Sequence, residues 1–134
     1  MDASLDTQSD SGSLAMRAID IFSDGSGGSC NLEITSLPFT ASISFFFDFP
    51  TLPEFVDNLI LLEKTLSGEA KLGQNYEEAY ICLQGNGRGA IRVSGLLAVY
   101  SEHTQELRFS FKTDQTALGK FIADLKEIIR ANAT

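Results

Sequence analysis

Residues 107–118 read Leu-Arg-Phe-Ser-Phe-Lys-Thr-Asp-Gln-Thr-Ala-Leu, and within this stretch the spacing of the apolar residues changes. Leu107, Phe109 and Phe111 alternate with polar residues, which predicts a strand with one buried face. Asp114 then stands at a suitable helix N-cap position. Apolar residues recur after it on one helical stripe: Leu118, Phe121, Ile122, Leu125, Ile128 and Ile129. The stretch therefore predicts a strand that leads directly into a closing amphipathic helix.

The same change of spacing occurs once earlier in the chain. Residues 51–54, Thr-Leu-Pro-Glu, form a capping-box pattern, and apolar residues at helical spacing follow it as far as Leu66. Gly68 stands where a glycine would end this helix. The apolar residues surround much of the helix, which indicates more than one packed face.

Alternating runs fill most of the remaining chain. Before the first helix, strands are predicted over residues 16–22, over 30–37 and from Pro38 to Phe47. After the helix, strands are predicted from about residue 70, over 80–84, from 91 to about 100, and over 107–111. The links between neighbouring strands have hairpin length, which requires antiparallel pairing.

The fold class expected from this order is α+β. We predict a single antiparallel sheet of about seven strands with both helices packed on one face, in the order βββ-α-ββββ-α. Residues 1–13 contain three aspartates, four serines and no positive charge, so a disordered acidic tail is expected there. Residues 14–134 are then expected to form a single domain.

Composition excludes several classes of partner. The chain has 10 Lys and Arg against 18 Asp and Glu, a formal net charge of −8, and such a chain repels nucleic-acid phosphates. It lacks an apolar run of about 18 residues that could span a membrane. Cys30 and Cys82 lie in alternating runs and are expected to pack as small hydrophobic residues. The acidic N-terminus does not resemble a signal peptide, so a cytoplasmic location is expected.

The sequence contains only isolated candidates for catalytic groups. His103 is the single histidine and falls in a predicted turn without the partners of a catalytic triad. Residues 85–89, Gly-Asn-Gly-Arg-Gly, lie between strands, whereas a phosphate-binding loop precedes a helix. Glu77 and Glu78 are adjacent in a predicted turn and are expected to face solvent. We predict no catalytic residue, no cofactor and no metal, although a pair of acid–base carboxylates remains open.

One face of the predicted sheet carries an unfavourable pair. Symmetric pairing about the turn at 101–103 places Arg92 opposite Lys112, and like charges across strands cost a few tenths to about 1 kcal/mol. Either a neighbouring acidic residue such as Glu33 or Glu69 neutralises the pair, or the face is kept for a partner.

Two outward-facing aromatic residues favour the partner interpretation. Phe46 and Tyr80 both lie in the outward register of their strands, and aromatic residues with arginine are typical of interface hot spots. Burial of Phe46 beneath the tail or another strand is the alternative. We name Phe46, Tyr80, Arg92 and Lys112 as candidate partner-binding residues.

Three stretches resemble the WapI-type family of bacterial immunity proteins. Residues 66–72 (LSGEAKL) resemble the family's helix end and strand entry, and residues 89–96 (GAIRVSGL) resemble one of its strands. Residues 107–118 resemble its L-x-F-x-F-x-x-D-Q-T-x-L signature. The resemblance covers about residues 39–130. Asp-Gln-Thr at 114–116 is the part that a generic strand-to-helix junction does not require.

The resemblance implies a non-enzymatic protein that binds and blocks a cognate toxin domain encoded nearby. Because a rigid sheet needs little reordering to bind, we expect this block to be steric. Because toxin contacts vary within such families, the resemblance identifies no contact residue. An acidic inhibitor would also be steered toward the basic cleft of a nuclease. The alternative is a small-ligand-binding or assembly-forming α+β module, which would show a pocket between helices and sheet. An enzyme is the third hypothesis.

Overall fold

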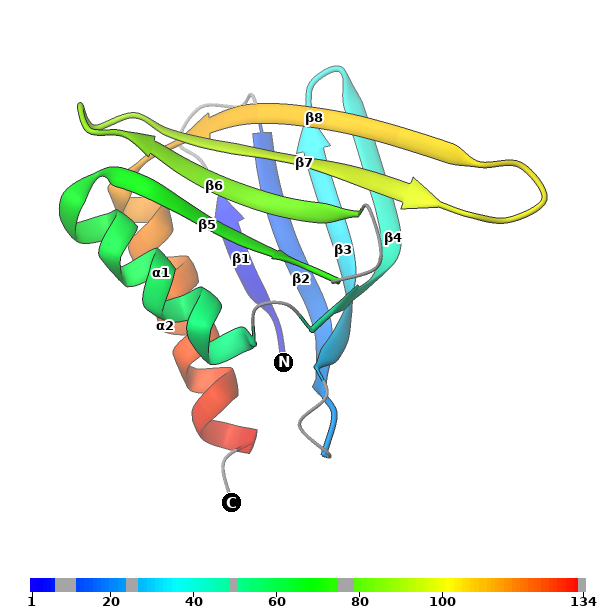
Figure 1. Cartoon of the computed structure of the whole chain (residues 1–134), viewed down its shortest axis with the longest axis horizontal. Coiled ribbons are helices and arrows are strands. Elements are labelled where there is room, and N and C mark those ends of the chain that lie inside the picture. Colours follow the sequence, from blue (N-terminus) through cyan, green and yellow to red (C-terminus); the bar gives the residue numbers. More distant parts are fainter. Residues whose placement is uncertain (7–11, 24–26, 49–50, 75–78, 133–134) are drawn as a thin grey trace.

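The computed structural model of the chain describes residues 1–6, 12–23, 27–48, 51–74 and 79–132. These residues form eight strands and two helices (Figure 1). The elements of the first half are β1 (Ala3–Asp6), β2 (Gly12–Ile21), β3 (Gly28–Ser36), β4 (Phe39–Phe47) and α1 (Leu52–Thr65). Those of the second half are β5 (Ser67–Gly73), β6 (Tyr80–Asn86), β7 (Ile91–Val99), β8 (Gln105–Thr113) and α2 (Gln115–Asn132).

The strands form two separate antiparallel sheets, which we call the N-terminal sheet (β1-β2-β3-β4) and the C-terminal sheet (β5-β6-β7-β8). In Figure 1 the two sheets lie one in front of the other, and their strands cross at a steep angle. The α+β class and the antiparallel pairing are therefore confirmed, whereas the single seven-stranded sheet is wrong. The physical reason is burial: the apolar faces of the two sheets and the helices pack into one hydrophobic cluster, which a single open sheet of this size would leave partly exposed.

Both apolar sheet faces are buried in one hydrophobic cluster that also includes both helices. The largest fully buried side chains are Phe45, Phe47, Phe55 and Phe121. The helices lie together at one side of the sheets, where α1 contacts β5 and α2 contacts β1 (Figure 1). This placement covers the outer edges of two edge strands, which would otherwise expose unpaired backbone groups.

The N-terminal residues belong to the folded part of the chain. β1 pairs with β2, and the side chains of Ala3 and Leu5 are 1% and 0% exposed. The prediction of a disordered tail over residues 1–13 is thus wrong for residues 3–6 and for residues 12–13, which begin β2, while residues 7–11 lie outside the described part. Asp124 Oδ2 accepts a hydrogen bond from the Ser4 backbone N–H over 3.2 Å. The acidic composition predicted disorder because it counts few apolar residues. Two buried apolar side chains and a polar contact such as Ser4 with Asp124 are nevertheless enough to order a short strand that pairs with an existing sheet.

The predicted N-caps of both helices are confirmed. Thr51 Oγ1 accepts from the Glu54 N–H over 3.4 Å, and Asp114 Oδ1 accepts from the Ala117 N–H over 2.8 Å. The predicted end of α1 at Gly68 is wrong. Leu66 takes the left-handed conformation at the C-cap, with φ of 57°, and the chain enters β5 at once.

Candidate partner-binding surface

The C-terminal sheet turns one face to the core and carries most of its exposed side chains on the other, although Cys82 and Leu96 on this outer face are buried. Across its outer face, Gln84 pairs with Arg92 and Arg92 pairs with Lys112, so these three side chains form one row. The next row contains Ser94 and Ser110. The predicted pairing of Arg92 with Lys112 is confirmed, because alternation and the turn together determine the register of this hairpin.

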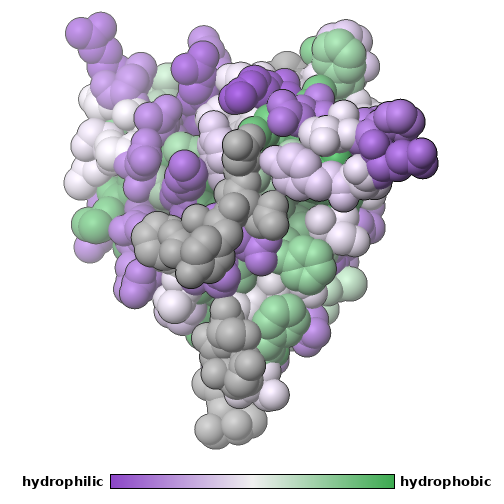
Figure 2. All heavy atoms as spheres, turned by 45° about the vertical axis from the view of Figure 1, so that its right-hand side comes forward, coloured by the Kyte–Doolittle hydropathy of each residue, from purple (hydrophilic) through white to green (hydrophobic). Residues whose placement is uncertain are grey.

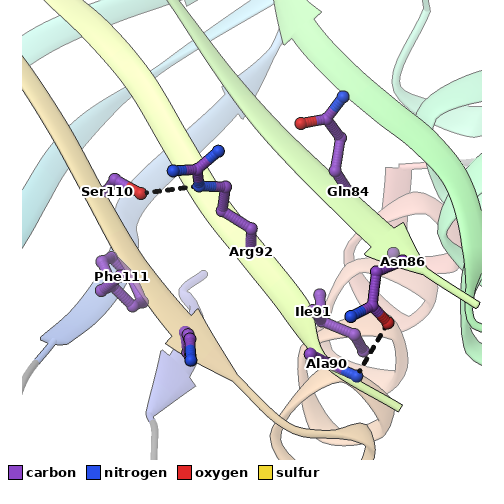
Figure 3. Close-up of a pocket in the computed structure, with 9 residues that line it drawn as sticks. Gln84, Asn86, Ala90, Ile91, Arg92, Ser110 and Phe111 are labelled. Carbon is purple, nitrogen blue, oxygen red and sulfur yellow. Dashed lines mark hydrogen bonds between the residues drawn. The ribbon is translucent and has the colours of Figure 1, made fainter. Parts of the chain in front are cut away.

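The Arg92 side chain is held in place from the neighbouring strand. Its Nε–H donates to Ser110 Oγ over 3.0 Å, and Figure 3 shows Arg92 reaching toward Ser110 while Gln84 points away. Ser110 lies diagonally across from Arg92, two residues before Lys112, which is within reach of a long side chain. Alternation along β8 places Ser110 on the same face as Lys112, but no sequence pattern indicates its hydrogen bond to Arg92.

Among the residues that the structure describes, no acidic neighbour neutralises the pair. Glu33 binds Arg17 on the N-terminal sheet, with Oε2 and Nε 2.7 Å apart. Glu69 Oε2 accepts a hydrogen bond from Gln84 Nε2 over 3.0 Å. Over the described ranges, neither Arg92 nor Lys112 has a carboxylate within 4.0 Å. Glu33 and Glu69, the two residues considered from the sequence, therefore do not neutralise the charges of Arg92 and Lys112.

An open groove of about 540 Å³ lies beside the row (Figure 3). Its polar lining comes from three strands, β6, β7 and β8: Gln84, Asn86, Arg92, Ser110 and Lys112. The Asn86 side chain is committed to the turn, because its Oδ1 accepts from the N–H groups of Arg88 and Ala90 at 2.7 and 3.3 Å. Arg92 and Lys112 are thus the charged side chains that line the groove and can contact a ligand.

The outer face of the C-terminal sheet is basic, although the chain carries a net charge of −8. By register, four basic and two acidic side chains occupy this face: Lys71, Arg92, Arg108, Lys112, Glu69 and Glu106. Elsewhere, Arg17, Lys120 and Arg130 each form an ion pair with a nearby carboxylate. Net charge therefore does not describe the charge of this particular surface.

Tyr80 also lies on the outer face, at its other end. The ring is half-buried, and Lys71 Nζ lies 4.3 Å from its centroid, a cation–π arrangement. Tyr80 pairs with Leu96, whereas Arg92 pairs with Gln84, which is four residues or about 13 Å along β6. The structure thus brings Arg92 and Lys112 together but places Tyr80 apart from them.

Phe46 belongs to a third place, the outer edge of the N-terminal sheet. Its side chain is 48% exposed, so the outward register is confirmed and the alternative of burial is wrong. Within the described ranges β4 pairs only with β3, and residues 39–47 carry no charge that would protect an edge strand. A hollow of about 410 Å³ follows this edge, with Ala79 and Val99 on its other side. Figure 2 turns this side forward and shows hydrophobic side chains among hydrophilic ones.

Comparison with known families identifies the family to which this fold belongs. The model of the "Immunity protein WapI-like family" matches residues 8–132. The chain belongs to the WapI-like family. The match is longer than the resemblance over residues 39–130 and includes β2 and β3. Searches of curated proteins and of solved structures each find no match.

Membership of the WapI-like family indicates a toxin-immunity role and a protein partner. Proteins of this kind are generally not enzymes.

His103 is exposed in the β7–β8 turn, where its carbonyl accepts from Ser101 Oγ over 3.1 Å. Glu77 and Glu78 lie outside the described residues. In the part of the chain that the structure describes, His, Cys, Asp and Glu side chains form no group of three able to hold a metal ion.

The two cysteines of this WapI-like protein are free and buried. Burial raises the pKa of the Cys30 thiol to about 12 and that of the Cys82 thiol to about 11. Thiols with such values are poor nucleophiles at neutral pH, because the thiolate is the reactive form. None of the helices described is long and apolar enough to cross a membrane.

Proposed function

We propose that this chain binds a cognate toxin domain encoded nearby in a bacterial genome and blocks it sterically, with no chemistry of its own. The observation that carries this proposal is the family match, which covers residues 8–132. The proposed place of action is the cytoplasm, and two free, buried cysteines are compatible with a reducing compartment.

The scaffold suits steric inhibition. A strand-built surface with a continuous core needs little reordering on binding, which limits the entropic cost of association. We propose Phe46, Tyr80, Arg92 and Lys112 as partner contacts. Phe46 supplies exposed aromatic area at an open strand edge, while Arg92 and Lys112 supply charge on the outer face of the C-terminal sheet.

A co-expression rescue tests the proposal. The C-terminal domain of the large secreted protein encoded beside this gene is expressed with and without the chain, and the tagged chain is then pulled down. We expect the toxin domain alone to stop growth, and the chain to restore growth and to retain the domain in a stable complex. Toxicity that persists with a folded, well-expressed chain, and no complex, would contradict the proposal.

One observation favours the ligand-binding alternative. An apolar hollow of about 370 Å³ lies between the end of the N-terminal sheet, the start of α1 and the end of α2, with Phe47, Leu52 and Ile129 in its lining. Its size falls within the range of small-molecule sites. Native mass spectrometry of the freshly purified chain separates the two functions. A retained small molecule would favour the ligand module, and the mass of the bare chain would favour the immunity function.

A further inference from the structure

The fold keeps two cations side by side at a cost. Arg92 and Lys112 are direct cross-strand neighbours, and directly opposed like charges destabilise a sheet. Within the described ranges no carboxylate offsets them. The chain has acidic residues in excess, yet the nearest candidate on the same row, Glu69, is hydrogen-bonded to Gln84 instead. The positive charge of this groove is therefore left open to whatever approaches from solvent.

The Arg92 guanidinium is oriented to receive an anion. Its Nε–H is used by Ser110, and no described residue accepts from its two terminal nitrogens. Those nitrogens present a planar fork that matches the two oxygens of a carboxylate. Lys112 lies on the adjacent strand of the same groove and adds a second cationic donor. Ser110 acts here as a positioning residue, since it restricts the rotation of the arginine.

We propose that the groove between Arg92 and Lys112 receives an Asp or Glu side chain from an exposed acidic segment of the toxin domain. The inference rests on the proposed function and names the chemistry of the partner. Charge complementarity supports an acidic partner side chain, because the outer face of the C-terminal sheet has a surplus of basic side chains. A long nucleic acid is a poor occupant, because the net charge of −8 repels an extended polyanion. The contact is thus opposite in sign to the one that net charge alone predicts.

The first experiment measures the affinity of the purified toxin domain for charge-reversed variants. We expect Arg92→Glu/Lys112→Glu to weaken binding by about 10- to 100-fold, as loss of a charge-assisted contact plus new repulsion requires. The matched control is Lys64→Glu/Lys126→Glu, which makes the same change of net charge at exposed positions on α1 and α2. Ser110→Ala is expected to weaken binding by only about 2- to 5-fold. Equal affinity of the two double variants would overturn the inference and leave the proposed function intact.

A second experiment does not need the toxin. The ¹⁵N-labelled chain is titrated with hexaglutamate, and the Arg92 side-chain Nε–H and the Ser110 amide are followed by NMR. We expect shifts concentrated on the groove with hexaglutamate, none with hexalysine, and loss of the shifts in Arg92→Glu/Lys112→Glu. Shifts that spread evenly over the surface, or no shifts at the groove, would overturn the inference. Binding of hexaglutamate here, with a toxin domain that neither binds nor is neutralised, is a separate result. That result would show that the proposed function is wrong and that the groove between Arg92 and Lys112 still binds carboxylate side chains.

Discussion

The side-chain amide of Gln115 donates a hydrogen bond to the backbone carbonyl of Glu63 over 2.8 Å, joining the start of α2 to the last turn of α1. Carbonyls in the last turn of a helix have no partner within the helix. Gln115 satisfies one of them across 52 residues of sequence. This contact gives a physical reason for Asp-Gln-Thr at 114–116: Asp114 caps its own helix and Gln115 caps its neighbour.

Replacing Gln115 by alanine should therefore destabilise the fold. We expect Gln115→Ala to lower the free energy of unfolding by about 1 kcal/mol, the usual value of one hydrogen bond. Urea denaturation followed by circular dichroism measures the change. Gln105→Ala, at an exposed position at the start of β8, is the control and should change stability by less than about 0.5 kcal/mol. Equal effects of the two substitutions would mean that the inter-helix contact contributes nothing.

Thr113 is expected to tolerate loss of its hydroxyl. The residue is 8% exposed, and its Oγ1 is buried without a hydrogen-bond partner in the described structure. A buried hydroxyl without a partner costs about 1–3 kcal/mol, so Thr113→Val should raise the free energy of unfolding by up to about 1 kcal/mol. Thr40→Val on the exposed edge strand is the comparison. Thermal unfolding would disprove the expectation if Thr113→Val melted below the wild type.

Ala18 offers a stabilising glycine substitution. It sits in the bulge between Arg17 and Asp20 with φ of 52°, a conformation that costs a residue with a Cβ about 1–2 kcal/mol. Ala18→Gly removes that strain but increases unfolded-state freedom, so we expect a net gain of up to about 1 kcal/mol. Ala123→Gly, at an exposed position inside α2, should instead lose about 1 kcal/mol. Chemical denaturation of both variants tests whether the free energy of unfolding rises in Ala18→Gly and falls in Ala123→Gly.

The thiols should be almost unreactive in the folded protein. A cysteine with an ordinary pKa near 8.5 is about one-quarter thiolate at pH 8. A pKa of about 11 reduces that fraction for Cys82 to about one in a thousand, and a pKa of about 12 reduces it further for Cys30. We expect slow reaction with Ellman's reagent at pH 8 and rapid reaction of both thiols in urea. A thiol that reacts in the native state at the rate seen in urea would contradict this.

Neighbouring phenylalanines in β4 should separate stability from binding. Phe45 is 2% exposed, so Phe45→Ser should lower the free energy of unfolding by about 3–5 kcal/mol. Phe46 is half-exposed, so Phe46→Ser should lower it by less than about 1 kcal/mol. Phe46→Ser should nevertheless weaken toxin binding if β4 is a contact. Leu61→Ser, which removes an exposed apolar side chain from α1, is the control and should bind normally. Unchanged affinity of Phe46→Ser removes this residue from the proposed contacts.

Local patterns determined most of the secondary structure from sequence alone. Both helix N-caps and the pairing of Arg92 with Lys112 follow from short-range rules of spacing and turn geometry. The position of Phe46 at the surface follows from alternation in the same way. These features depend on residues close together in the chain or joined by one short turn, which is why the sequence predicts them.

Long-range contacts decided the rest. The division into two sheets, the inclusion of β1 and the basic outer face of an acidic chain all depend on which distant residues meet. Ser4 and Asp124, whose contact holds the edge of β1, are 120 positions apart. Alternation assigns each side chain to one face of its strand, but it does not say which strands share a sheet. Burial of apolar area between the sheets settles that choice, because it depends on the packing of the whole chain.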